Sequence, residues 1–200
     1  MSPRVLLMFA SIALGGAAHA QAVPVRRGLE LSIGLGGGSA RLECASCSSA
    51  VQVRSAALLQ AGIFVKPTLL IAAEVAALAG PSGLGGPDES ITFVTPIVQW
   101  YPRATSGLYA KGGIGFATGY IRPGGERVTS DGVGLSIGAG VEVPLRRTIS
   151  LAPYAVYRRT VGARVGRPTT MRGTSFHASA LQFGLLIGFH RARPARPLTS

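Results

Sequence analysis

The chain has 200 residues, enough for one domain, and its 20 Lys and Arg against 8 Asp and Glu give a formal net charge of +12. Its mean hydropathy of +0.36 is high for a water-soluble protein. Beyond the N-terminal segment, however, no uncharged apolar run reaches the ~18 residues that a membrane-spanning helix needs. High hydropathy without a spanning helix, together with 28 glycines, favours a membrane β-barrel.

The N-terminus has the pattern of a secretory signal peptide. Arg4 supplies a positive charge, residues 5–14 form a short apolar run, and Ala18-His19-Ala20 is an A-x-A cleavage site. We therefore expect residues 1–20 to be a signal peptide and the mature chain to start at Gln21. The alternative is an uncleaved anchor, but an apolar run of about ten residues is too short to cross a bilayer.

So basic a chain raises the possibility of nucleic-acid binding. The export signal argues against that partner, and the basic residues cluster in connections and at the C-terminus rather than along one helix face. Acidic lipid surfaces are the better match, so we expect outer-membrane lipids as partners and no nucleic acid.

Bulky apolar residues alternate with small or polar ones along most of the remaining chain, which is the period of a β-strand. The predicted strands, in chain order, are 28–37, 54–65, 69–78, 89–101, 108–119, 132–143, 149–158 and 176–190. In the last strand Leu181, Phe183 and Leu185 fall on one face and Gln182 and Gly184 on the other. The pattern predicts an all-β fold: a closed, eight-stranded, antiparallel transmembrane barrel in up-and-down meander order, with its apolar residues outward.

Two features oppose this prediction locally. Residues 69–78 are rich in helix formers, so a helix is a plausible alternative there. We keep the strand because an odd number of strands would leave open sheet edges, which lipid does not tolerate. Pro96 and Pro153 also fall within predicted strands, where each removes a ladder hydrogen bond.

The predicted connections alternate between long and short. Those at 38–53, 79–88, 120–131 and 159–175 are long, and those at 66–68, 102–107 and 144–148 are short. Bacterial outer-membrane barrels have long loops outside and short turns in the periplasm, and an even strand count puts both termini in the periplasm. We expect residues 21–190 to form the barrel and residues 191–200 to be a basic C-terminal tail.

Several segments give the chain a resemblance to known proteins: VQWYP (98–102), LYAKGGIGFATGY (108–120), GLSIGAGVEV (134–143), SLAPYAVYR (150–158) and LQFGLLIGFH (181–190). With these, the chain resembles the small eight-stranded outer-membrane barrels of the OmpA/OmpX kind, and the uncharacterised "outer membrane protein beta-barrel" families more closely. The resemblance implies location in the bacterial outer membrane. It also implies that the barrel assembly machinery recognises an aromatic residue ending the last strand, a position that Phe189 matches although the chain continues to Ser200.

Cys44 and Cys47 lie in a stretch rich in glycine and serine. An exported protein meets an oxidising compartment, so a local disulfide between them is our prediction. A C-x-x-C pair can instead serve redox chemistry or bind zinc. The redox form accompanies a βαβ unit, and zinc would need a second pair of ligands, neither of which the sequence supplies.

The inward-facing parity carries charged residues. Glu30, Glu74, Lys111 and Glu142 fall on it, together with glutamines at 60, 99 and 182. Charges inside a narrow barrel must be paired or hydrated, so we predict a structural ion network in the lumen. An ion pathway is the functional alternative.

His177-Ala178-Ser179 is similar to the His-x-Ser motif of outer-membrane lipid A deacylases, but no Asp or Glu follows it to orient the histidine. We therefore expect no enzymatic activity and no cofactor. Our prediction is a monomeric barrel with a structural or surface-interaction role. A lipid A-modifying enzyme and a small-solute, porin-like pore are the alternatives.

Overall fold

The computed structural model describes residues 26–44, 47–48, 52–80, 89–121, 128–166 and 175–191. Within these ranges the regular structure is entirely β, and no helix is long and apolar enough to cross a membrane. The strands are β1 (Gly28–Cys44), β2 (Cys47–Ser48), β3 (Gln52–Lys66), β4 (Leu69–Ala79), β5 (Glu89–Trp100), β6 (Leu108–Ile121), β7 (Val128–Val141), β8 (Val143–Arg146), β9 (Ile149–Gly166) and β10 (Ser175–Arg191).

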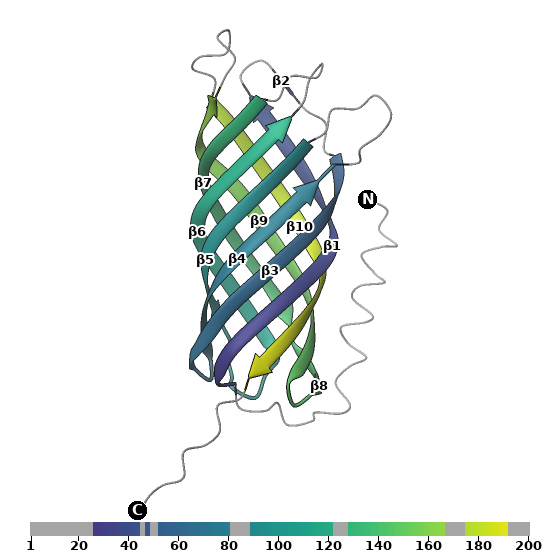
Figure 1. Ribbon diagram of the computed structural model, residues 1–200, viewed down its shortest axis with the longest axis vertical. Helices are drawn as coiled ribbons and strands as arrows, with labels where there is room; N and C mark the ends of the chain where they lie inside the picture. Colours follow the sequence, from purple (N-terminus) through teal and green to yellow (C-terminus); the bar gives the residue numbers. More distant parts are fainter. Residues whose placement is uncertain are drawn as a thin grey trace, which may run out of the picture.

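The strands form a closed antiparallel meander in the order β10-β1-β3-β4-β5-β6-β7-β9, and pairing of β9 with β10 closes it (Figure 1). Two short strands do not add to this circuit. β2 pairs with the end of β1, and β8 continues β7 along β9 without a change of register, since Gly140 pairs with Tyr154 and Val143 with Leu151. The predicted eight-stranded transmembrane barrel is therefore confirmed.

The two faces of the sheet differ as the alternation predicted. Outward residues such as Leu35 and Phe116 are 71% and 75% exposed, whereas inward residues such as Leu70 and Gln182 are fully buried. The segment 69–79 is strand β4, and it alternates between buried and exposed positions along its length. It pairs with both β3 and β5, so ladder hydrogen bonds on both sides outweigh the helix propensity of its alanines.

The strands extend further than predicted at the end opposite the short turns. Predicted loops at 38–53, 120–131 and 159–175 are shortened, because β1 continues to Cys44, β7 begins at Val128 and β9 runs to Gly166. The apolar alternation ends before the pairing does. Ser39, for example, still pairs with both Leu181 and Val53. Backbone hydrogen bonds need no apolar side chain, so hydrophobicity alone underestimated these strands.

Local irregularities occur where the sequence lacks a donor or needs close approach. Pro96 pairs with Ala73 of β4, but pairing of β5 with β6 is interrupted at this proline, which has no N–H to donate. Between β7 and β8, the Glu142 N–H donates to the Gly107 carbonyl at 2.8 Å. A Cβ at Gly107 would collide with the Glu142 carbonyl, so this approach requires glycine.

Inward glycines make room for large side chains from other strands. A Cβ at Gly140 would collide with the Tyr109 hydroxyl, and one at Gly134 would lie 3.0 Å from the Phe93 ring. Tyr109 and Phe93 are 2% and 1% exposed. Small residues on β7 are therefore what allow aromatic rings to fill the lumen.

A closed barrel has no free sheet edge, so it should resist detergent at room temperature. We expect an unboiled sample to migrate in gel electrophoresis at a different apparent mass from a boiled one. Identical migration of the two, with a helical circular dichroism spectrum, is incompatible with this fold.

Candidate functional site

The centre of the lumen holds an ion triad. The Glu74 carboxylate of β4 accepts hydrogen bonds from Lys111 of β6 and from Arg158 of β9. The three residues are 1%, 4% and 0% exposed, so their charges are removed from water. Arg158 also donates to the Gln182 side chain, which donates in turn to the Tyr154 hydroxyl at 2.8 Å. One carboxylate thus accepts hydrogen bonds from two buried cations, and neutral polar groups take up further donors.

Glutamine side chains connect this triad to a second carboxylate. Lys111 Nζ lies 3.5 Å from Gln60 Oε1, and Gln60 Nε2 lies 3.3 Å from Glu30 Oε1 and 3.2 Å from Gln99 Oε1. Glu30 Oε1 also accepts a hydrogen bond from the Ser32 hydroxyl at 2.8 Å. The Gln60 amide therefore links Lys111 to Glu30.

The network continues to the short-turn end of the barrel. Gln99 Nε2 donates to the Tyr101 hydroxyl at 2.6 Å, and that hydroxyl donates to Glu142 Oε2 at 3.0 Å. Arg26 Nε donates to the same carboxylate oxygen at 2.9 Å, while the Arg26 guanidinium lies 3.9 Å from the centre of the Tyr101 ring. The second carboxylate oxygen, Glu142 Oε1, lies 2.9 Å from His190 Nε2.

Arg26 closes this end of the lumen. It comes from the segment just before β1, and it donates to the carbonyls of Ala104 and Ser106 in the β5–β6 turn at 3.1 and 3.0 Å. The side chain is buried although it belongs to no strand. The chain entering the barrel therefore seals its own short-turn end with a buried guanidinium.

The other end of the lumen is largely apolar, although Arg54, Ser130 and Thr160 are also buried there. A cluster of buried hydrophobic side chains fills it, formed by Ala40, Ala56, Leu78, Ile91, Phe93, Ala117, Ala178 and Ala180. The Arg158 guanidinium lies 5.8 Å from the centre of the Phe93 ring, which marks the boundary between the polar and apolar parts. The polar network, this apolar cluster and the buried polar side chains beside it fill the interior across the described strands.

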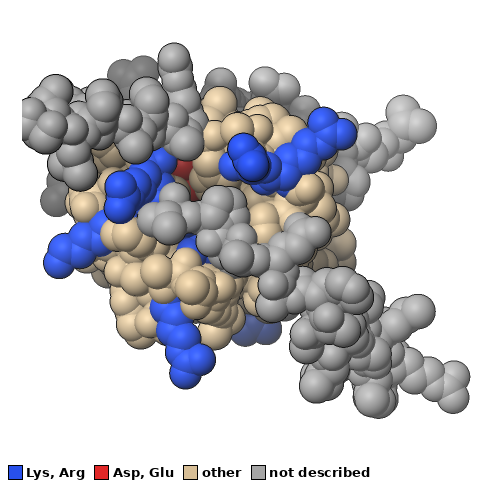
Figure 2. Space-filling model, turned by 90° about the horizontal axis from the view of Figure 1, so that it is seen from below, with Lys and Arg blue, Asp and Glu red and all other residues tan. Residues whose placement is uncertain are grey.

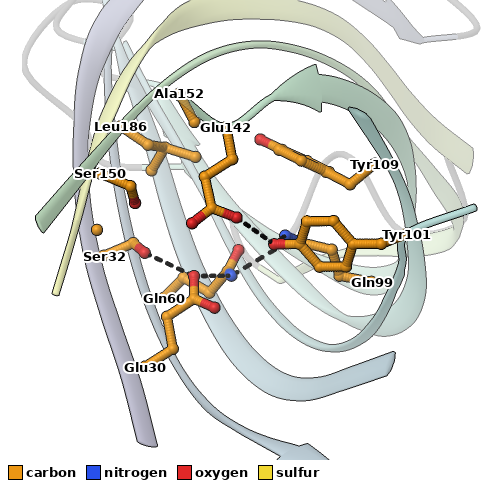
Figure 3. A pocket seen from close by; sticks show the side chains of 11 residues that line it. Glu30, Ser32, Gln60, Gln99, Tyr101, Tyr109, Glu142, Ser150, Ala152 and Leu186 are labelled. Carbon is orange, nitrogen blue, oxygen red and sulfur yellow. Dashed lines mark hydrogen bonds between the residues drawn. The ribbon is translucent and has the colours of Figure 1, made fainter. Parts of the chain in front are cut away.

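One small cavity of about 10 Å³ lies within the network, beside Glu30, Tyr109 and Glu142 (Figure 3). In Figure 3 these side chains point toward one another from different strands. Glu30 Oε2 and the Tyr109 hydroxyl have no hydrogen-bond partner among the described residues. The volume matches about one water molecule.

The four charged residues singled out in the sequence all lie in the lumen. Lys111 and Glu74 are in direct contact, Glu142 pairs with Arg26, and Glu30 is reached only through Gln60. Sequence reasoning missed Arg26, Arg54 and Arg158, all of which are buried. Arg158 follows the inward parity of Tyr154 and Val156, so the alternation could have identified it. No pattern in the sequence could have identified Arg26 as a lumen residue, because its position depends on the path of the chain before β1.

The remaining predicted positions lie outside this network. Cys44 and Cys47 are directly opposed in the pairing of β1 with β2, a spacing that a disulfide can bridge, and the disulfide stays a prediction. Phe189 is outward and 44% exposed near the short-turn end of β10, and its role in assembly also stays a prediction. The signal peptide and the tail from residue 192 lie outside the described residues, and no group of three His, Cys, Asp or Glu within the described residues could hold a metal ion.

The pairing register adds a carboxylic residue near the His-x-Ser motif. His177 and Ser179 are half-buried on the outward parity of β10, and His177 is directly opposed to Glu43 of β1. Ser179 is opposed to Arg41 of β1 and to Arg159 of β9. The sequence shows no acidic residue after Ser179, but the fold places Glu43 beside His177 from more than a hundred residues earlier in the chain.

No family model matches this chain, and no curated protein matches it. Among solved structures, it is similar to Neisserial surface protein A, with a TM-score of 0.56 and 12% identity over 80% of this chain and 96% of that one. It is also similar to Ail, the attachment invasion locus protein of Yersinia pestis, with a TM-score of 0.52 and 13% identity over 82% and 99%. The expected resemblance to small outer-membrane barrels is thus confirmed for the fold.

Removal of Glu74 and removal of Lys111 should have different effects on stability, because Glu74 is the shared partner in the triad. Glu74→Gln leaves two cations in the lumen without their shared carboxylate, so we expect it to lower the free energy of unfolding by about 3–5 kcal/mol. Lys111→Met leaves Arg158 and Glu74 as a neutral pair, so its cost should be smaller, about 1–2 kcal/mol. Urea unfolding of the barrel in lipid vesicles measures both.

The double variant, Glu74→Gln with Lys111→Met, should recover part of the loss caused by Glu74→Gln alone, because one buried cation is then removed. Asp131→Asn, at an exposed position of β7, is the control for loss of a carboxylate and should have little effect. A larger loss for Lys111→Met than for Glu74→Gln would contradict the shared-carboxylate arrangement.

Proposed function

We propose that this protein is a monomeric barrel of the bacterial outer membrane, exported with a cleaved signal peptide and inserted by the barrel assembly machinery. Its short turns then face the periplasm and its long connections face outside. The proposed role is structural or surface-interacting and non-enzymatic, with membrane lipids as its immediate partners. The lumen serves stability and carries neither solutes nor a reaction.

The observation that carries this proposal is the filling of the lumen. An uninterrupted sequence of contacts runs from Arg26 through Glu142, Tyr101 and the glutamines to Lys111, Glu74 and Arg158. The apolar cluster around Phe93 and the buried side chains of Arg54, Ser130 and Thr160 lie beyond Arg158. A water-filled pathway would need these groups to separate, which would leave charges unpaired in a low-dielectric interior.

Purified protein in planar bilayers should therefore show no steady conductance. A general porin inserted under the same conditions is the positive control, and the different gel migration of boiled and unboiled protein verifies folding. Discrete, reproducible channels whose ion selectivity changes with Lys111→Glu would instead support the pore alternative, because Lys111 lies within the path that ions would follow.

A lipid A-modifying enzyme is the second candidate, and the opposition of His177 and Glu43 favours it. His177 and Ser179 lie on the outward parity, where a lipid ester could approach. The register brings Glu43, an acidic residue of the type that completes such a hydrolytic site, to the position opposite His177. In that reaction the serine oxygen would attack an ester carbonyl while the histidine accepts its proton and passes it to the departing lipid alcohol. Water would then hydrolyse the acyl-serine ester, which releases the fatty acid and restores the serine.

The two candidates make opposite predictions for lipid A. Under the non-enzymatic proposal, mass spectrometry of lipid A from cells with and without the protein should show the same number of acyl chains. Loss of an acyl chain that requires His177 and Ser179 would establish the enzyme. Ser39→Ala is the matched control, since Ser39 lies on the outward parity of β1, opposed to Leu181.

A further inference from the structure

Exposed cations surround the short-turn end of the barrel. Figure 2 shows this end from below, with Lys and Arg side chains projecting at several points around its edge. The described residues that contribute are Arg27, Lys66, Arg103, Arg146 and Arg147, and all five are exposed. We refer to these five residues as the basic collar. They come from the start of β1 and from all three short turns, so the charge is spread around the rim.

The collar has no exposed carboxylate beside it within the described part of the chain. Glu30 and Glu142 are near this end but are buried in the lumen, 7% and 8% exposed. Glu142 is paired with Arg26, which belongs to the closed interior. Asp131 is exposed, but it lies in β7 near the opposite end. The rim is therefore a surface of one sign of charge, complementary to anions.

The collar adjoins the apolar outer surface of the barrel. Val65, beside Lys66, is 50% exposed; Trp100, three residues before Arg103, is 53% exposed; and Leu145, beside Arg146, is 58% exposed. Outward apolar residues of a transmembrane barrel contact acyl chains, and tryptophan prefers the level of the lipid head groups. The cations thus follow directly on the hydrocarbon boundary, where phosphate groups of lipids are found.

We propose that the basic collar binds the phosphate groups of anionic phospholipids, of the phosphatidylglycerol class, in the periplasmic leaflet. This deepens the proposed surface-interaction role, and it rests on the proposed orientation, in which the short turns face the periplasm. A distribution around the lipid-facing rim favours lipid head groups over a polymer bound below the barrel. Each cation near an anionic surface strengthens binding by about fivefold, so a few acting together suffice for local enrichment.

The chain contains a built-in probe for this enrichment. Its single tryptophan, Trp100, lies at the rim, where the Tyr101 N–H donates to the Thr68 carbonyl of the turn after Lys66. Brominated acyl chains quench tryptophan fluorescence on contact. Full-length protein is refolded into phosphatidylcholine vesicles that contain either brominated phosphatidylglycerol or brominated phosphatidylcholine at the same mole fraction. Both leaflets then have the same composition, so the direction of insertion does not matter.

We expect brominated phosphatidylglycerol to quench Trp100 with at least about twofold higher relative association than brominated phosphatidylcholine, and salt to reduce the difference. Lys66→Gln with Arg103→Gln, the collar positions nearest to Trp100 in the chain, should abolish the preference. Arg41→Gln with Arg159→Gln removes the same charge from exposed positions toward the other end and should retain it. Gel migration of unboiled samples verifies that each variant is folded.

Equal quenching by the two lipids in the unmodified protein would overturn the proposal, as would a preference that survives Lys66→Gln with Arg103→Gln. Co-sedimentation with isolated peptidoglycan covers the other anionic partner. Collar-dependent binding to peptidoglycan without a lipid preference would reassign the surface to the cell wall. A negative result in the quenching experiment would not change the conductance expected in planar bilayers. The basic collar and the closed lumen are therefore tested independently.

Discussion

The interior of this barrel depends on a single buried carboxylate. Glu74 compensates both Lys111 and Arg158, and each of the three comes from a different strand. Loss of Glu74 is the most damaging change to this arrangement, because it would leave two buried cations without a carboxylate. The small residues of β7 are part of the same requirement. Gly140 leaves space for the Tyr109 ring, and Tyr109 in turn borders the cavity beside Glu30 and Glu142.

Much of this fold could be predicted from the sequence, because a period of two places each residue on one face of the sheet. That is why Glu74 and Lys111 could be assigned to the lumen before their contact was known. The contact itself could not be predicted, since it depends on the relative registers of β4, β5 and β6. The full length of the strands at the end opposite the short turns was not predicted, for another reason. Polar residues such as Ser39 continue the hydrogen-bonded ladder there without any hydrophobic signal.

Because side chains fill the lumen, the outer surface of the barrel is the place to look for a functional site. There the register again adds information that the linear sequence lacks. His177 and Ser179 are two residues apart in β10, but their neighbours across the sheet, Glu43 and Arg41, come from the first strand. Barrel closure places an acidic residue, Glu43, at the position opposite His177. The neighbours of a segment on the last strand therefore become known only when the first strand is placed beside it.

The positions of the acidic residues explain why the short-turn rim is positively charged in the described part of the chain. Glu30, Glu74 and Glu142 all lie inside, where they accept hydrogen bonds from lumen side chains. Carboxylates held there are too buried to balance the cations of the short turns. The same partition that stabilises the lumen thus leaves the rim positively charged, and this charge follows directly on an apolar surface. The placement of acidic residues inside the barrel therefore has two results. The carboxylates accept hydrogen bonds in the lumen, and the cations of the rim are left to attract anions.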